Sequence, residues 1–91
     1  MRASILERQC DCCDYFSVEA NADYEICPIC GWEQESWGAD DLDIESGANH
    51  ELTLREARLF FQLHGYPCAE LAHCVDPSLD RKQFRFLARD L

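Results

Sequence analysis

Two pairs of cysteines constrain this chain more than any other feature of its sequence. They follow the spacing Cys10-x2-Cys13-x13-Cys27-x2-Cys30. A separation of two residues lets both sulfurs of a tight loop reach one tetrahedral ion, with metal–sulfur distances of about 2.3 Å. Four thiolates fill every position around such an ion, whereas catalytic zinc keeps one position open. The spacing therefore predicts one structural zinc ion, although iron would use the same four ligands.

The remaining cysteines leave alternatives open, because the chain has seven in all. Residues 1–9 contain no signal-peptide core and no stretch is long enough to cross a bilayer, so we expect a cytoplasmic protein with reduced thiols. Cys12 is a third thiol in the first loop and competes with Cys10 and Cys13, whose spacing is the usual one. Cys68 and Cys74 are expected to be small buried apolar residues. The alternative for them is a second metal site that includes His73.

The segments around the cysteines predict a small α+β fold in a single domain, residues 1–91. Tyr15–Val18 and Tyr24–Ile26 are rich in strand formers and flank a turn at residues 21–23. We therefore expect a zinc-ribbon-like β-hairpin within residues 10–37 that brings the two CxxC knuckles face to face, with Trp32 packed over them. Residues 38–52 are acidic and contain Gly38 and Gly47, which predicts a loop.

Two or three helices are expected to follow this acidic loop. Thr53 and Glu56 match a capping box, in which each residue hydrogen-bonds to the backbone of the other. Gly65 and Pro67 then end the pattern, which predicts a helix over residues 53–65. Its apolar face is formed by Leu54, Ala57, Phe60, Phe61, Leu63 and His64. Residues 67–91 are expected to be a C-terminal helical part, with a short turn at 67–74 and a second helix over 78–90.

The formal net charge is −10, and the acid is concentrated ahead of the predicted helix. Eight carboxylates lie between Glu33 and Glu56, where Arg55 is the one basic residue. Such a balance repels phosphate backbones and anionic membranes and attracts basic protein surfaces. We therefore expect a protein partner with a basic surface, and no nucleic acid or membrane; the alternative is that the acid only keeps a small domain soluble. The residues expected to contact the partner are Trp37, Asp40, Asp41, Asp43 and Glu45.

The sequence carries no recognisable catalytic constellation, because its histidines are scattered and it has neither a hydrolase serine motif nor a phosphate-binding glycine loop. We therefore expect no enzyme but a zinc-stabilised acidic protein-binding module. An immunity or antitoxin protein that blocks a basic toxin would be one form of it. One alternative is a zinc-ribbon adaptor in a nucleic-acid or translation complex, through the basic residues Arg81, Lys82, Arg85 and Arg89. Another is a thiol redox or metal-handling protein that uses Cys12, Cys68 and Cys74.

Several motifs of the chain resemble those of the bacterial cysteine-rich CPCC family. They are Cys10-Asp-Cys-Cys13, Tyr24-Glu-Ile-Cys-Pro-Ile-Cys-Gly-Trp-Glu33, Gly47-Ala-Asn49 and Leu52-Thr-Leu-Arg-Glu-Ala57, in the family's order over residues 10–65. The chain departs from the family's Cys-Pro-Cys-Cys-Gly loop at Asp11, where the family has proline, and at Asp14, where it has glycine. The resemblance implies a zinc-binding domain and brings no established activity.

Overall fold

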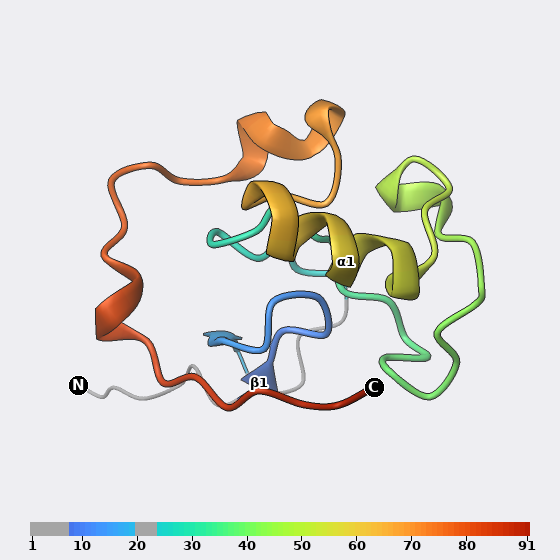
Figure 1. Ribbon diagram of the computed structural model, residues 1–91, viewed down its shortest axis with the longest axis horizontal. Coiled ribbons are helices and arrows are strands. Elements are labelled where there is room, and N and C mark those ends of the chain that lie inside the picture. The colour runs from blue at the N-terminus through green and yellow to red at the C-terminus, as the bar shows by residue number, and fades with distance from the viewer. Residues whose placement is uncertain (1–7, 20–23) are drawn as a thin grey trace.

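The first cysteine pair lies inside a small β-hairpin of its own. The computed structural model describes residues 8–19 and 24–91 and is shown in Figure 1. Strand β1 (Arg8–Gln9) pairs antiparallel with β2 (Phe16–Val18), and the reversal between the strands carries Cys10 and Cys13. Opposite residues are Arg8 with Val18 and Gln9 with Phe16, so the ladder contains an irregularity. The first knuckle is therefore closed by its own flanking residues.

The second CxxC loop is also bridged by the residues on either side of it. The predicted hairpin between the two cysteine pairs is therefore wrong. Residues 16–18 do form a strand, but its partner is β1 and not residues 24–26. Ile26 instead forms a β-bridge with Glu33 across the second knuckle. Each CxxC loop reverses the chain, so the backbone groups beside it bond to each other, as in the 2.9 Å bond from Cys27 N to Trp32 O. The predicted turn at 21–23 lies outside the described residues.

The acidic segment 38–52 is a loop, as predicted, and it contains one short helical turn that was not predicted. The 3-10 helix η1 (Gly47–Asn49) is flanked by a β-bridge between Ser46 and Leu52. The buried Asn49 side chain accepts from Glu33 N at 2.8 Å and donates to Glu33 O at 2.9 Å. This pair of bonds ties the acidic loop to the second knuckle.

Helix α1 (Leu54–His64) confirms the predicted helix and both of its ends. The Thr53 hydroxyl accepts from Glu56 N at 3.2 Å, and the Glu56 carboxylate accepts from Thr53 N at 3.0 Å. At the other end Gly65 has φ +86° and donates to Phe61 O. The buried residues of the helix are Leu54, Ala57 and Arg58. The apolar face is narrower than predicted, because His64 is exposed and Leu63 is 65% exposed.

The C-terminal part differs from the prediction beyond its first turn. The 3-10 helix η2 (Ala69–Cys74) matches the expected short turn, but the second helix over 78–90 is absent from this described segment, which contains only the 3-10 turn η3 (Arg81–Gln83). Residues 84–91 are extended, and Phe86 forms a β-bridge with Tyr15. Phe16 N donates to Arg85 O at 2.8 Å. Pairing with the chain around β2 thus replaces the helical hydrogen bonds of this segment.

The core of the molecule is built around sulfur. Figure 1 shows α1 across the middle of the molecule, with the acidic loop at one side and the C-terminal segment returning beneath β1. The buried cluster consists of Cys10, Cys12, Cys13, Val18, Cys27, Ile29, Cys30, Trp32, Leu54 and Ala57. Trp32 is 2% exposed, which confirms its predicted place over the knuckles. No helix within the described residues has the length and apolar character that a membrane crossing requires.

Candidate metal centre

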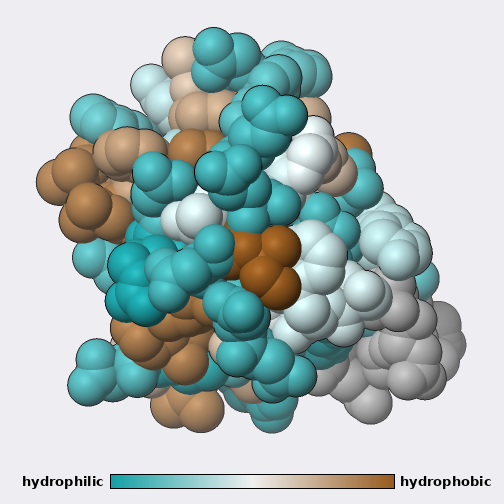
Figure 2. All heavy atoms as spheres, turned by 90° about the vertical axis from the view of Figure 1, so that its right-hand side faces the viewer, coloured by the Kyte–Doolittle hydropathy of each residue, from teal (hydrophilic) through white to brown (hydrophobic). Residues whose placement is uncertain are grey.

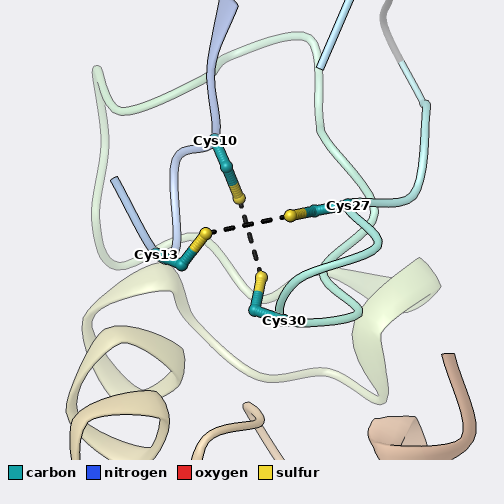
Figure 3. Close-up of side chains that lie close together, drawn as sticks. All are labelled: Cys10, Cys13, Cys27 and Cys30. Atoms are coloured by element: carbon teal, nitrogen blue, oxygen red, sulfur yellow. Dashed lines mark hydrogen bonds between the residues drawn. The ribbon is translucent and has the colours of Figure 1, made fainter. Parts of the chain in front are cut away.

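Four cysteine sulfurs converge on one point between the two knuckles, as Figure 3 shows. The Sγ atoms of Cys10, Cys13, Cys27 and Cys30 all lie within 4.8 Å of one another. The Sγ–Sγ distance is 3.6 Å between Cys10 and Cys30 and 3.8 Å between Cys13 and Cys27. Metal–sulfur bonds of about 2.3 Å in a tetrahedron place the sulfurs about 3.8 Å apart. The cluster therefore has the size and the donor set for one tetrahedral metal ion.

The two knuckles use the same backbone conformation, with a left-handed residue after the second cysteine. Gly31 has φ +89° and donates from N to Cys27 O at 2.8 Å. Asp14 has φ +70° and donates from N to Cys10 O at 3.1 Å. A β-carbon on Gly31 would lie 2.7 Å from the carbonyl oxygen of Leu71, so only glycine fits at the second position. Asp14 occupies the first position despite having a side chain, and aspartate tolerates this conformation better than most residues.

Several hydrogen bonds reach the sulfurs and would stabilise them as thiolates. Backbone N–H groups provide two, from Ile29 to Cys27 at 3.3 Å and from Trp32 to Cys30 at 3.4 Å. These are the bonds expected when Gly31 takes its left-handed conformation. The sequence did not predict two side-chain contacts. The Ser17 hydroxyl lies 3.0 Å from Cys27 Sγ, and the Gln34 amide donates to Cys10 Sγ at 3.3 Å. The sequence signal that could have indicated these contacts is that Ser17 and Gln34 each lie on a short extended segment beside a CxxC loop.

The cluster is closed to solvent. Cys10, Cys27 and Cys30 are 0% exposed and Cys13 is 4% exposed. Burial raises the pKa of the Cys10 and Cys30 thiols, because a lone thiolate is costly in an apolar interior. A metal ion would therefore displace protons as it binds, and would supply the positive charge that makes four adjacent thiolates stable.

A buried ion-pair network lies against the first knuckle, and sequence reasoning missed it. Arg58 of α1 binds the Asp14 carboxylate through both terminal nitrogens at 2.8 Å and donates to Asp11 O at 2.7 Å. Arg89 donates to the same carboxylate from N and Nε at 2.9 Å, and to Cys10 O at 2.9 Å. Burial disfavours the Asp14 anion, but the hydrogen bonds from Arg58 and Arg89 outweigh this and lower the pKa of Asp14. The spacing of Arg58 from Leu54 and Phe61 placed it on the buried face of the helix.

The other three cysteines lie outside the group of four converging sulfurs. Cys12 is 3% exposed and buried in the core. Cys68 and Cys74 are half-buried, so they are less enclosed than predicted. Cys74 Sγ lies 3.4 Å from His73 Nε2, but in residues 8–19 and 24–91 only the four-cysteine cluster brings three or more potential metal ligands together. This arrangement does not support the alternative of a second metal site at Cys68, His73 and Cys74.

The residues predicted to contact a partner lie on the loop between the second knuckle and α1. Asp40, Asp41, Asp43 and Glu45 are exposed, whereas Trp37 is half-buried. Asp43 is engaged with Arg55, which donates to its two carboxylate oxygens at 2.9 and 3.1 Å. Figure 2 faces the side that carries this loop and shows a mostly hydrophilic surface with separate apolar patches. A role in partner binding stays a prediction for all five residues.

The fold and the site define a small cysteine-rich protein whose two knuckles enclose a four-sulfur cluster suited to one metal ion. The sequence model of the Cysteine-rich CPCC family matches residues 8–82, and the chain belongs to this family. The match extends beyond residues 10–65, where the family's motifs were recognised, and includes η2 and the start of η3. No curated protein and no solved structure matches the chain.

Proposed function

We propose that the protein is a non-enzymatic, zinc-stabilised module that binds a protein partner with a basic surface. The observation that carries the proposal is the closed cluster of four buried cysteine sulfurs. Four thiolates occupy the whole tetrahedron around zinc, so no position remains for a water or substrate. Zinc in such a site stabilises the fold and leaves the molecular surface to perform the function.

The surface charge supports a basic protein as the partner. The formal net charge is −10, and Asp40, Asp41 and Glu45 extend from an exposed loop. Opposite charges accelerate the encounter of two proteins and suppress wrong partners. An immunity or antitoxin protein that blocks a basic toxin is the particular form of this function that we favour. Seven free cysteines suit the reducing cytoplasm, where such a protein would act.

The alternative of a nucleic-acid adaptor has less support, because most cations of the C-terminal segment are engaged within the molecule. Arg81 lies over the ring of Phe61 and donates to Ile29 O at 3.3 Å. Arg85 lies 3.9 Å above the ring of Phe16, and Arg89 is bound to Asp14. A basic patch that attracts phosphates needs its cations free at the surface.

Native mass spectrometry of the tagged full chain, purified gently from its own cytoplasm, tests the proposal. We expect one zinc ion per chain and a co-purifying basic protein. Serine at Asp40, Asp41 and Asp43 should weaken that complex and reduce its dependence on salt. Amide replacement of the exposed Glu51, Glu70 and Asp90 makes the same change in net charge and serves as the control. A zinc-loaded chain without any protein partner, or one carrying nucleic acid instead, would contradict the proposal.

A further inference from the structure

An open groove lies between the second knuckle and the C-terminal segment, away from the acidic loop. Its volume is about 490 Å³, and it is lined by Ser17, Glu19, Glu25, Ile26, Pro28, Asp76, Leu79 and Phe84. These residues come from the end of β2, from the entry to the second knuckle and from the chain on either side of η3. Figure 1 shows residues 75–84 at the opposite side of the molecule from the acidic loop.

The walls of the groove are fixed by hydrogen bonds to the knuckles. Asp76 N donates to Pro28 O at 2.8 Å, which joins the C-terminal wall to the second knuckle. Near Phe84, Phe16 N donates to Arg85 O at 2.8 Å and so joins the same segment to β2. Ser17 is buried and contacts Cys27 Sγ. These contacts join the groove to the segments that carry the cysteines, which favours a preformed binding surface.

Four of the residues that line the groove are apolar and partly open to solvent. Ile26 is 45% exposed, although a large aliphatic residue beside a buried cluster is usually covered. Pro28, Leu79 and Phe84 are half-buried and continue the apolar surface. This surface suits the hydrocarbon stem of a long side chain, which gains free energy when it is removed from water.

Three of the residues that line the groove are anionic. Glu19, Glu25 and Asp76 carry carboxylates, and none of the described residues that line the groove is arginine, lysine or histidine. Asp76 accepts from Ser78 N at 3.0 Å and from the Ser78 hydroxyl at 2.7 Å, which holds its carboxylate in place. Within the described residues these carboxylates do not come close enough together to form a metal-binding group, unlike the four cysteines. The apolar and anionic lining residues are together complementary to an organic cation with a hydrocarbon stem.

We propose that this groove binds an arginine or lysine side chain presented by a protein partner, with its stem on Ile26 and Phe84 and its charge among the three carboxylates. An arginine fits best, because its planar guanidinium can lie on the Phe84 ring while it donates to more than one carboxylate. The inference rests on the proposed function and deepens it. It places the anchor of the partner beside the metal centre and assigns the acidic loop to long-range attraction.

Titration of the zinc-loaded, nitrogen-15-labelled full chain with acetyl-Leu-Arg-Leu-amide tests the groove directly. The probe peptide should produce saturable shifts at the amide resonances of Glu25, Ile26 and Asp76 and leave those of residues 40–45 unchanged. The matched peptide with citrulline in place of arginine has nearly the same shape without the charge. It should bind at least about fivefold more weakly, because it loses the contacts between the cation and the carboxylates.

Two double variants with the same net charge separate local from long-range effects. Glu25→Gln with Asp76→Asn should weaken the arginine peptide about fivefold, whereas Asp40→Asn with Asp41→Asn should change its affinity less than about twofold. Equal zinc content and matching spectra establish that each variant is folded. The proposed cation site would be overturned if both double variants weakened the arginine peptide equally, or if the citrulline peptide bound equally well. It would also be overturned if calcium chloride displaced the peptide but sodium chloride at the same ionic strength did not.

The same variants distinguish failure of the groove from failure of the proposed function. A co-purifying basic partner that binds normally to the Glu25→Gln and Asp76→Asn variant, but not to the acidic-loop variant, refutes the groove and leaves the binding function intact. Absence of any protein partner refutes the binding function. The peptide titration still decides whether the groove recognises a cation.

Discussion

Asp14 performs at the first knuckle the conformational task that Gly31 performs at the second, and it adds charge. Its backbone has φ +70°, and its carboxylate is bound by both Arg58 and Arg89. Glycine would take this conformation without cost but could not join α1 and the C-terminal segment to the metal loop. Asp11, the other departure from the family pattern, donates from N to the Gln34 side chain at 3.1 Å. Proline could not make this bond, because it has no N–H group.

Replacement of Asp14 by alanine should strongly destabilise the zinc-loaded protein. The change leaves the buried Arg58 guanidinium without its counter-ion, a loss of about 3 kcal/mol in the free energy of unfolding. Urea unfolding at neutral pH measures it. Asp43→Ala removes a similar pair with Arg55, but that pair is exposed to water, so the unfolding midpoint should hardly move. Similar losses in both variants would show that burial of the Asp14 network contributes nothing.

A glycine at position 14 separates the two roles of this aspartate. Asp14→Gly also loses the ion pairs, but it removes the β-carbon from a left-handed backbone. It should therefore be more stable than Asp14→Ala by about 1 kcal/mol in the same urea experiment. An alanine variant as stable as the glycine variant would mean that the positive φ at position 14 costs nothing.

The Ser17 hydroxyl should tune the metal affinity of the cluster. It lies 3.0 Å from Cys27 Sγ, and loss of one such partner of a metal ligand typically weakens metal binding by about tenfold or more. Ser17→Ala should show this loss when zinc is partitioned between the protein and a coloured chelator. Ser36→Ala, at an exposed position, is the control and should bind zinc like the unmodified chain.

Among the elements, α1 has ends that depend on a few side chains. Thr53→Ala removes the hydroxyl that accepts from Glu56 N and should lower the free energy of unfolding by about 1 kcal/mol. Thr53→Ser keeps the hydroxyl and should lose much less, and urea unfolding with circular dichroism compares the two. Equal losses would attribute the effect to the threonine methyl group and not to the cap.

The elements that could be predicted from the sequence are those whose stability is determined locally. The capping box, the left-handed stop at Gly65 and the two CxxC loops each depend on residues within one or two turns of chain, and all appear as predicted. The hairpin partner of β2 was predicted incorrectly, because β1 competes for the same backbone groups. Residues 84–91 have apolar residues at helical spacing, yet Leu87 is 61% exposed and the segment pairs with Tyr15 and Phe16 instead.

The site likewise has one part that the local sequence predicts and another part that it does not. Its four sulfurs could be predicted from cysteine spacing alone, because each pair is local and two pairs make a tetrahedron. Arg58 and Asp14 are separated by 44 residues, and each is a charged residue of a kind usually found at the surface. Their pairing depends on how α1 sits over the first knuckle, which no local pattern specifies.

At the scale of the whole molecule, we expect the protein to depend on a metal ion, because sulfur occupies the centre of its core. Five of the ten residues in the buried cluster are cysteines, so the apolar contacts that remain are few for a chain of this size. Treatment with a strong chelator should abolish the cooperative thermal unfolding transition. The same chelator saturated with zinc is the control and should leave the transition unchanged. A metal-free chain with an unaltered transition would contradict a structural role for the ion.

The same dependence predicts how stability changes with acid. Ligand thiols must lose their protons to bind metal, so protons compete with zinc more strongly as the pH falls. The melting temperature of the zinc-loaded protein should therefore fall from about pH 8 to about pH 5, and excess zinc should shift this loss to lower pH. Differential scanning fluorimetry at several zinc concentrations measures both effects. A loss that does not respond to zinc would assign the acid sensitivity to groups outside the cluster.

The contact of Arg89 with Cys10 and Asp14 joins residues that are synthesised at very different times. A ribosome releases a chain from its N-terminus, so all four cysteines emerge before the segment that carries Arg89. We therefore expect the knuckles to be able to bind an ion before that segment packs against them. Arg89 then binds Cys10 and Asp14 and holds its segment over the first knuckle.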